Sequence, residues 1–290
     1  MSTSTSARDI TPAEDLVGFF GPHSITWRIH ADPSFSVGGI RALLLQALHP
    51  VAMAGVHRFS EGFRNEPWMR LTRTAEYVAT LTFGTRREAL RAVRRVRGGH
   101  RGLSDTEPTT GRTYSVDDPD LLLWVHACEV DSLLDVARRS GVPLTDAEAD
   151  RYVAEQVVAG ELIGCTPGEV PASVAELATY FERVRPELAL TDPARDAYRF
   201  IVVPPMPAWV QLLTPARPAW AGLASLGIAT LPRWARSMYG LPGLAVTDAA
   251  ATAAARAFRQ TVLAVPQRVR DNPTLQAARV RTATARPAVA

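Results

Sequence analysis

The sequence contains no lysine, and all 32 of its basic residues are arginine. Without lysine the chain can form neither a Schiff base with a carbonyl substrate nor a P-loop nucleotide site, which excludes several large enzyme classes. It also has only two cysteines, Cys128 and Cys165, which are too few for a disulfide framework or a zinc finger. We therefore expect a fold that is held together by its apolar core in a reducing compartment.

Long uninterrupted hydrophobic runs and a strong net charge are missing too. The longest apolar stretch, 208–234, is broken by three prolines and by Arg217, so no membrane span is predicted. Residues 1–9 are rich in serine and threonine and lack the apolar region of a signal peptide, so we expect 1–13 to be the disordered lead-in of a cytoplasmic protein. A net charge of +3 gives no footprint for nucleic-acid binding.

What the sequence does contain is typical of a globular all-α protein. Apolar residues make up 47% of the chain, and most segments show helical spacing between capping residues. No repeat or linker divides the chain, so we expect one helical domain over 14–274 and a tail over 275–290 that frays or lies along the surface. The predicted helices cover 65–84, 85–100, 118–141, 145–164, 173–184, 209–231 and 248–263.

The histidines are unevenly distributed. All six lie in the first 126 residues, which places any imidazole-based ligation or proton transfer in the N-terminal half. None has a glutamate three residues before it, and the zincin, covalent-haem, α/β-hydrolase and dinucleotide-binding motifs are all missing. A noncovalent haem remains open, because it needs only one axial side chain and an apolar slot. The six are His23, His30, His49, His57, His100 and His126.

His100 and His126 are the histidines on apolar helix faces. His100 continues the stripe of Ala89, Val93 and Val96 on a helix otherwise covered by arginine, so its ring is expected to point inward. There it could ligate iron, or it could be a core histidine bonded to a backbone carbonyl, and the two look alike in sequence. His126 lies on a leucine-rich helix and could be a second ligand or part of a cavity wall.

Two groups of polar residues accompany these histidines. The run 86–101 contains seven arginines and one acidic residue, and it reads mostly as a solvated helix face from which one or two arginines could pair with haem propionates. Arg70, Arg73 and Thr74, at spacing i, i+3 and i+4, head a stripe that then becomes apolar. They could donate hydrogen bonds to dioxygen or an oxyanion and relay a proton, or they could form a surface ion pair with a nearby glutamate.

Short motifs follow one another in a set order along the chain. They include Gly21-Pro22-His23-Ser24, Leu45-Gln46-Ala47-Leu48-His49-Pro50, Arg70-Leu71-Thr72-Arg73-Thr74, Val96-Arg97-Gly98-Gly99-His100, Asp118-Pro119, Leu123-Trp124-Val125-His126-Ala127 and Pro204-Pro205. Their order and spacing, over about 14–281, resemble the latex-clearing protein (rubber oxygenase) and MpaB-type oxygenase superfamily. The likeness is closest to the small bacterial members, which are largely of unknown function.

The resemblance implies an all-α, globin-like core that holds a noncovalent haem b and uses dioxygen as co-substrate. His100 is implied to be the proximal iron ligand, in the family's Val-Arg-x-x-His pattern. Arg97 of the same pattern is implied to be a cofactor-binding residue. His126 belongs to the Trp-Val-His pattern of the small bacterial members and is implied to line the pocket.

On the distal side, Arg70 and Thr74 match the family's arginine and threonine, whereas Arg73 stands where rubber oxygenases have a lysine and cannot act as a neutral amine. The first hypothesis is a haem-dependent oxygenase for a hydrophobic, isoprenoid-like substrate, in which both arginines polarise dioxygen and Thr74 assists proton movement. The alternative is a noncatalytic haem- or lipid-binding helical protein that keeps the family fold. The missing lysine favours the alternative, and the retention of Arg70, Thr74 and His100 opposes it.

Overall fold

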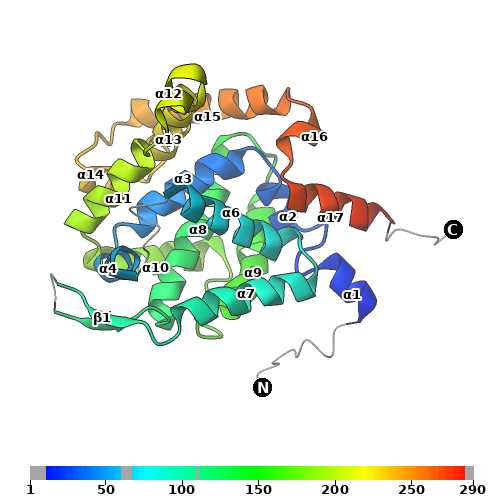
Figure 1. The fold of residues 1–290 in the computed structure, drawn as a ribbon, viewed down its shortest axis with the longest axis horizontal. Helices are drawn as coiled ribbons and strands as arrows, with labels where there is room; N and C mark the ends of the chain where they lie inside the picture. The colour runs from blue at the N-terminus through cyan, green and yellow to red at the C-terminus, as the bar shows by residue number, and fades with distance from the viewer. Residues whose placement is uncertain (1–10, 60–66, 109–110, 285–290) are drawn as a thin grey trace.

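The computed structural model describes residues 11–59, 67–108 and 111–284, and helices make up most of this part of the chain (Figure 1). Its two strands, β1 (Ser104–Thr106) and β2 (Thr113–Ser115), form a small antiparallel hairpin. The prediction of a helical protein is confirmed apart from this hairpin. The helices are α1 (Pro12–Val17), α2 (Ile25–His30), α3 (Ser34–Gln46), α4 (Pro50–Phe59), α6 (Pro67–Phe83), α7 (Arg86–His100), α8 (Pro119–Arg139), α9 (Asp146–Ile163), α10 (Val174–Val184), the 3-10 turn η1 (Arg185–Glu187), α11 (Asp192–Val202), α12 (Ala208–Leu213), α13 (Ala216–Ala229), α14 (Arg233–Met238), α15 (Ala245–Leu263), α16 (Gln267–Arg270) and α17 (Pro273–Thr284).

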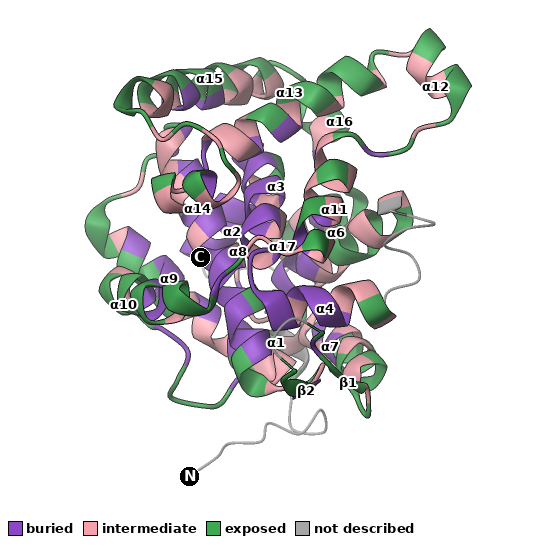
Figure 2. Ribbon diagram, turned by 90° about the vertical axis from the view of Figure 1, so that its left-hand side faces the viewer, coloured by how far each residue is buried: buried purple, intermediate pink, exposed green. Residues whose placement is uncertain are grey.

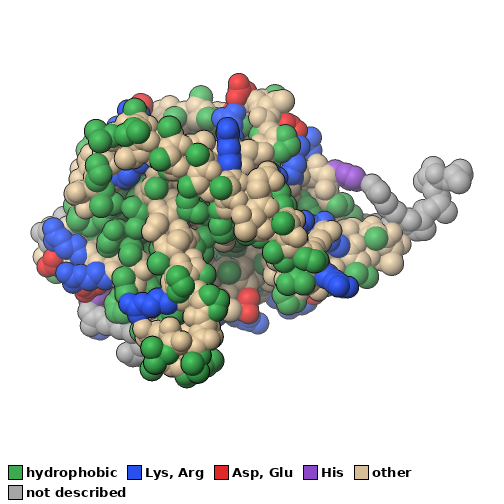
Figure 3. Space-filling model, turned by 90° about the horizontal axis from the view of Figure 1, so that it is seen from above, with side chains coloured by type: hydrophobic (Ala, Val, Ile, Leu, Met, Phe, Trp, Pro, Cys, Tyr) green, Lys and Arg blue, Asp and Glu red, His purple; other side chains and the backbone are tan. Residues whose placement is uncertain are grey.

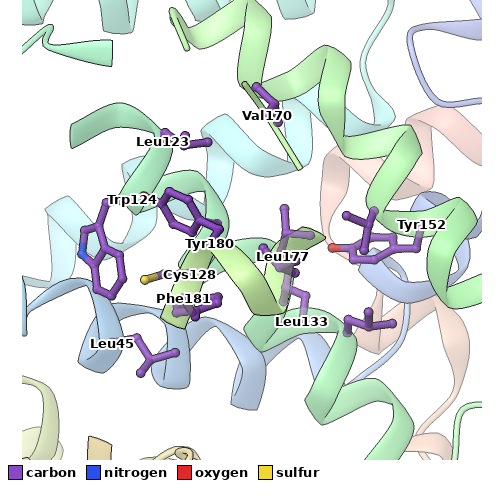
Figure 4. Close-up of a cluster of buried hydrophobic side chains, with 14 of the residues drawn as sticks. Leu45, Leu123, Trp124, Cys128, Leu133, Tyr152, Val170, Leu177, Tyr180 and Phe181 are labelled. Carbon is purple, nitrogen blue, oxygen red and sulfur yellow. The ribbon is translucent and has the colours of Figure 1, made fainter. Parts of the chain in front are cut away.

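The core forms where α3 lies along α8, in the middle of the buried region of Figure 2. The two helices approach closely because Gly38 has no side chain, and a Cβ there would lie 2.8 Å from Cδ2 of Leu133. Trp124 of α8 is fully buried and donates its indole hydrogen to the Gln46 carbonyl at 3.1 Å. Its ring meets Phe181 of α10 edge-on at 5.7 Å between centroids, and Figure 4 shows both among the other core side chains.

Helix boundaries follow the local cap signals of the sequence. Thr85 and Thr145 each accept a hydrogen bond from the backbone of a glutamate three residues later, which completes the predicted starts of α7 and α9. Asp118 caps the N-terminus of α8, where its side chain accepts a hydrogen bond from the backbone N–H of Asp120. Pro50 starts a new helix, α4, which meets α3 at 102°. Within the described residues no single helix has the length and hydropathy of a membrane span, and only the bent α3–α4 pair reaches that composition.

The C-terminal third differs from the sequence-based expectation in two places. The helix predicted over 209–231 is broken at Thr214 and Pro215 into α12 and α13, because proline lacks the amide hydrogen that a continuous helix needs there. The tail from residue 275, expected to fray or to lie along the surface, forms α17 as far as Thr284 and does not fray over that range.

The reason for the second difference is a contact between segments far apart in sequence. Leu275 and Ala278 of α17 are buried against Trp27 of α2 and Phe83 of α6. The two aromatic rings meet edge-on at 4.9 Å and form the platform on which α17 packs. At the other end of the chain, residues 1–10 lie outside the described residues, and α1 begins at Pro12, within the expected lead-in.

Candidate functional site

Three helices carry the side chains that the sequence singled out, and a fourth, α9, packs beside them. Helix α6 carries Arg70, Arg73 and Thr74, α7 carries Arg97 and His100, and α8 carries His126. Helix α6 packs on α7, and α9 packs on both α7 and α8, so the four form one connected group (Figure 1). An apolar cluster that includes Leu81, Ala89, Val93 and Ala159, with Tyr77 packed against it, fills the space between α6, α7 and α9.

His100 occupies the last turn of α7. Its helix is anchored by the cap at Thr85 and by the buried face of Ala89 and Val93, and the arginines on the opposite face are exposed. The imidazole is half-buried, and burial lowers its pKa below the usual value. Its Nδ1 atom is buried and has no hydrogen-bond partner. The predicted inward orientation therefore agrees with the structure, while metal ligation stays a prediction.

His126 lies deeper, on the face of α8 that meets α9. Burial lowers its pKa to about 4, so the ring is neutral at physiological pH. A backbone hydrogen bond with Gln156 partly offsets this fall in pKa, and Nε2 is buried without a hydrogen-bond partner among the described residues. A histidine with one nitrogen held by a backbone carbonyl and the other free is in the state that metal ligation or proton acceptance requires.

Gly160 of α9 lies against His126, and Gly164, at the end of the same helix, lies near Arg97. A Cβ on Gly160 would lie 3.1 Å from Nε2 of His126 and 3.0 Å from Cγ1 of Val170. Gly164 ends the helix with a φ of +124°, and a Cβ there would lie 3.7 Å from the guanidinium carbon of Arg97. These glycines thus keep α9 free of side chains beside His126 and Arg97.

The three predicted residues of α6 do not share one environment. Burial lowers the pKa of Arg70, which shows that protein surrounds its guanidinium. The Thr74 hydroxyl donates to the Arg70 carbonyl at 3.0 Å, as threonines inside helices often do, and it remains exposed. Arg73 is exposed and, among the described residues, has no ion-pair partner. In the same part of the chain, no hydrogen bond joins Arg73 or Thr74 to either histidine.

Glu129 is a site residue that the sequence analysis left without a role. It lies one turn after His126 on α8, and burial raises the pKa of its carboxyl group to about 7, although part of the side chain keeps contact with solvent. Its charge is close enough to Tyr77 of α6 to contribute to the raised pKa of that phenol. The available signal was a carboxylate at i+3 from a histidine on a leucine-rich helix.

His30, His49 and the two cysteines lie in surroundings typical of structural residues. His30 is buried and bonded to the hydroxyls of Thr82 at 2.8 Å and Tyr152 at 3.1 Å. His49 accepts the backbone hydrogen of Ala52 at 3.3 Å, in agreement with the structural role expected for it. Both cysteines are buried free thiols, as expected. Among the described residues, no three His, Cys, Asp or Glu side chains come together to form a protein-only metal centre.

Comparison with known proteins adds the family. A model of the "ER-bound oxygenase mpaB/B'/Rubber oxygenase, catalytic domain" matches residues 27–265. Uncharacterized proteins of Mycobacterium bovis (Mb2261) and Mycobacterium tuberculosis (Rv2237) are each 30% identical to this chain over 137 residues, which is 46% of the chain. The match covers 52% of each relative, so the chain spans about half the length of these proteins. No solved structure matches. The chain belongs to the family of mpaB-type and rubber oxygenase catalytic domains.

Proposed function

We propose that this chain is a haem b-dependent oxygenase that acts on a hydrophobic substrate. The observation that carries the proposal is the presence of two buried imidazole nitrogens without partners, Nδ1 of His100 and Nε2 of His126, within one helical group. A buried polar atom without a partner costs about 1–3 kcal/mol, and a bound group that satisfies it would remove this cost. The family membership supports oxygenase chemistry at these residues.

The residues present fit a haem. His100 would hold the haem iron, because its buried Nδ1 has no hydrogen-bond partner among the described residues. Arg97 is exposed near Gly164, where its guanidinium would pair with a propionate. Haem b, when bound, would supply the electron transfer to dioxygen that the protein side chains cannot supply.

The side chains of this protein would bind and orient the reactants. Arg70, which is half-buried, would donate hydrogen bonds to a reactant in a setting of lowered dielectric, where such bonds are strong. Glu129, whose pKa is about 7, holds or releases a proton on its carboxyl oxygen near neutral pH. Tyr77 and the apolar cluster between α6, α7 and α9 exclude water from this region. Thr74 and Arg73, both exposed, would act only toward a reactant that approaches the open face of α6.

The first experiment asks whether haem is bound and by which histidine. The protein, expressed with a haem precursor, should purify with a Soret band and about one haem per chain. His100→Ala should lose most of the haem, whereas His23→Ala, a matched change at an exposed histidine, should keep it. A wild-type protein without a Soret band would refute the haem proposal. Loss of haem in His126→Ala but not in His100→Ala would transfer the axial role to His126.

A second experiment separates catalysis from binding. The holoprotein is supplied with reductant and with polyprenoid or aromatic lipids, and oxygen uptake is recorded. Uptake that depends on the lipid and falls in Arg70→Ala, with the haem content unchanged, supports the oxygenase. The specific observation that favours a noncatalytic haem-binding protein is the exposure of Arg73 and Thr74. Haem without uptake on any lipid of the panel would select that alternative.

A further inference from the structure

The segment 203–213 exposes large hydrophobic side chains to solvent. Leu212 is 82% exposed, Leu213 79% and Trp209 63%, and α12 contains no buried residue. Figure 2 shows α12 standing out from the body of the protein, and Figure 3, which looks down on the same end, shows hydrophobic side chains over much of this face with scattered charged ones. A contiguous exposed apolar surface of this kind marks a binding site for another protein or for a membrane.

A pocket of about 580 Å³ lies behind this segment and is continuous with it, because Pro207 and Val210 belong to its lining. The volume is in the range of small-molecule sites. The remaining lining residues are Ser36, Trp68, Met206, Ala216, Ala219, Trp220, Leu223 and Phe258.

The polar groups of this lining are already used within the protein. Trp68 donates its indole hydrogen to the Pro205 carbonyl at 2.7 Å, and Trp220 donates to the Ile201 carbonyl at 2.8 Å. The Ser36 hydroxyl donates to a backbone carbonyl at 2.9 Å. A ligand therefore meets apolar surface and aromatic faces, which suits a hydrocarbon chain.

The charges around α12 favour an anionic partner. No acidic residue occurs between Asp196 and Asp248, while four arginines do. Three of them pair with these two aspartates. The fourth, Arg217, is exposed and bonds to the neutral side chain of Gln211, and among the described residues it has no ion-pair partner. Hydrophobic side chains flanked by an exposed cation are the combination that binds the surface of an anionic membrane.

We propose that segment 203–213 docks on an anionic lipid bilayer and that the pocket behind it receives a hydrocarbon chain from that bilayer. Trp209 would lie at the level of the headgroups, where tryptophan is enriched, and Leu212 and Leu213 would enter the acyl region. A second copy of the chain fits this face less well, because a stable dimer buries about 800 Å² per partner and a single projecting turn of helix offers far less flat surface. A fluid bilayer adapts to such a projection. This docking goes beyond the oxygenase proposal and does not depend on haem.

Vesicle flotation of the purified full chain tests the docking. We expect the protein to bind vesicles of phosphatidylcholine with 30% phosphatidylglycerol more tightly than pure phosphatidylcholine. The double variant Leu212→Ser/Leu213→Ser should lower the partition coefficient at least tenfold, since it removes two leucines from the acyl region. The control Val246→Ser/Val269→Ser changes two side chains elsewhere that are about 70% exposed, and it should stay within twofold of the wild type. Arg217→Gln should lower binding roughly fivefold on anionic vesicles only.

Fluorescence quenching tests the pocket. Vesicles whose acyl chains carry bromine should quench the protein, and part of the quenching should persist in Trp209→Phe because Trp68 and Trp220 line the pocket. It should fall again in Trp209→Phe/Trp220→Phe. Quenching that disappears completely with Trp209 would overturn the pocket assignment. Absence of vesicle binding, or equal binding by the wild type and the leucine double variant, would overturn the docking. A dimer that the double variant converts to a monomer would assign the face to a second copy instead.

Discussion

Replacing Gly160 by alanine tests the close contact with His126 directly. Gly160 lies inside α9, where it is buried, and Gly222 lies inside α13, where a Cβ would meet nothing within 4 Å. Neither glycine has a positive φ, so alanine fits the backbone at both positions. The pair Gly160→Ala and Gly222→Ala therefore makes the same chemical change with and without a neighbour.

The expected magnitudes follow from helix propensity and from these contacts. Alanine stabilises a helix by about 1 kcal/mol relative to glycine, so Gly222→Ala should raise the free energy of unfolding by about 0.5–1 kcal/mol. At Gly160 the new methyl group would lie 3.0 Å from Val170 and 3.1 Å from the ring of His126, closer than ordinary van der Waals contact. Overpacking of this kind costs about 1–3 kcal/mol. Gly160→Ala should consequently be less stable than Gly222→Ala by about 1–3 kcal/mol.

Urea unfolding of the two variants and the wild type measures this difference, and the haem content after purification gives a second readout. Gly160→Ala should also retain less haem than Gly222→Ala, because the methyl group narrows the space next to His126. If Gly160→Ala were stabilised as much as Gly222→Ala and kept its haem, the space beside the imidazole would be open. That result would contradict the close contact between α8 and α9 at Gly160 and His126.

Two further predictions concern acid and the C-terminal helix. Burial holds the folded-state pKa of His126 at about 4 and that of His30 at about 3, below the usual 6.5. Below pH 6.5 the unfolded chain therefore takes up protons that the folded protein does not. The free energy of unfolding should be at its full value above pH 6.5 and should fall as the pH is lowered toward 4, by up to about 1.4 kcal/mol per pH unit for each ring. Urea unfolding of His126→Gln between pH 7 and 4 should show a slope that is shallower by this amount, and an unchanged slope would place the proton uptake elsewhere. Leu275→Ala should weaken the docking of α17 by about 2–4 kcal/mol, seen as faster hydrogen exchange over 273–284, while Val280→Ala at an exposed position should change it by less than about 0.5 kcal/mol. Equal protection in the two variants would contradict the buried position of Leu275.

The helix boundaries could be predicted because their signals are local. Thr85 and Thr145 are each followed three residues later by a glutamate, and Asp118 precedes a proline at the first helical position. Each of these signals lies within one turn of the helix end that it defines. The kink at Pro50 was predictable for the same reason. The break at Pro215 carried a comparable signal, and the apolar character of the flanking residues outweighed it in the prediction of one long helix.

The position of α17 could not be predicted, because it depends on residues far away in the sequence. Leu275 and Ala278 form only a short apolar pair within an Ala/Arg/Thr-rich segment. Their partners, Trp27 and Phe83, come from α2 and α6, and they meet only once the chain is folded. The local sequence favours a helix here only weakly, and tertiary packing, which helix propensity does not describe, stabilises it.

In the candidate site, too, some features could be predicted from the sequence and others could not. His100 and His126 stood out because each lies on an apolar helix face, and that property is readable from spacing. The roles of Gly160 and Gln156 were invisible, since both act on His126 from α9 across the helix interface. As a result the sequence drew attention to His100, whereas the structure shows that His126 has the more complete environment, with one ring nitrogen held and the other free.

Helix α6 relates the two proposals to each other. Trp68 in its first turn lines the apolar pocket, and Arg70 and Thr74 follow on the same helix. At 1.5 Å per residue, Thr74 lies about 9 Å further along the axis than Trp68. Trp68 and Arg70 are about 200° apart around the helix, so the pocket and the polar stripe lie on different faces of one rigid element, within about two turns of each other along its axis. The leucine variants of α12 should therefore reduce the use of vesicle-bound lipid without altering the haem spectrum, because delivery and cofactor binding depend on different residues.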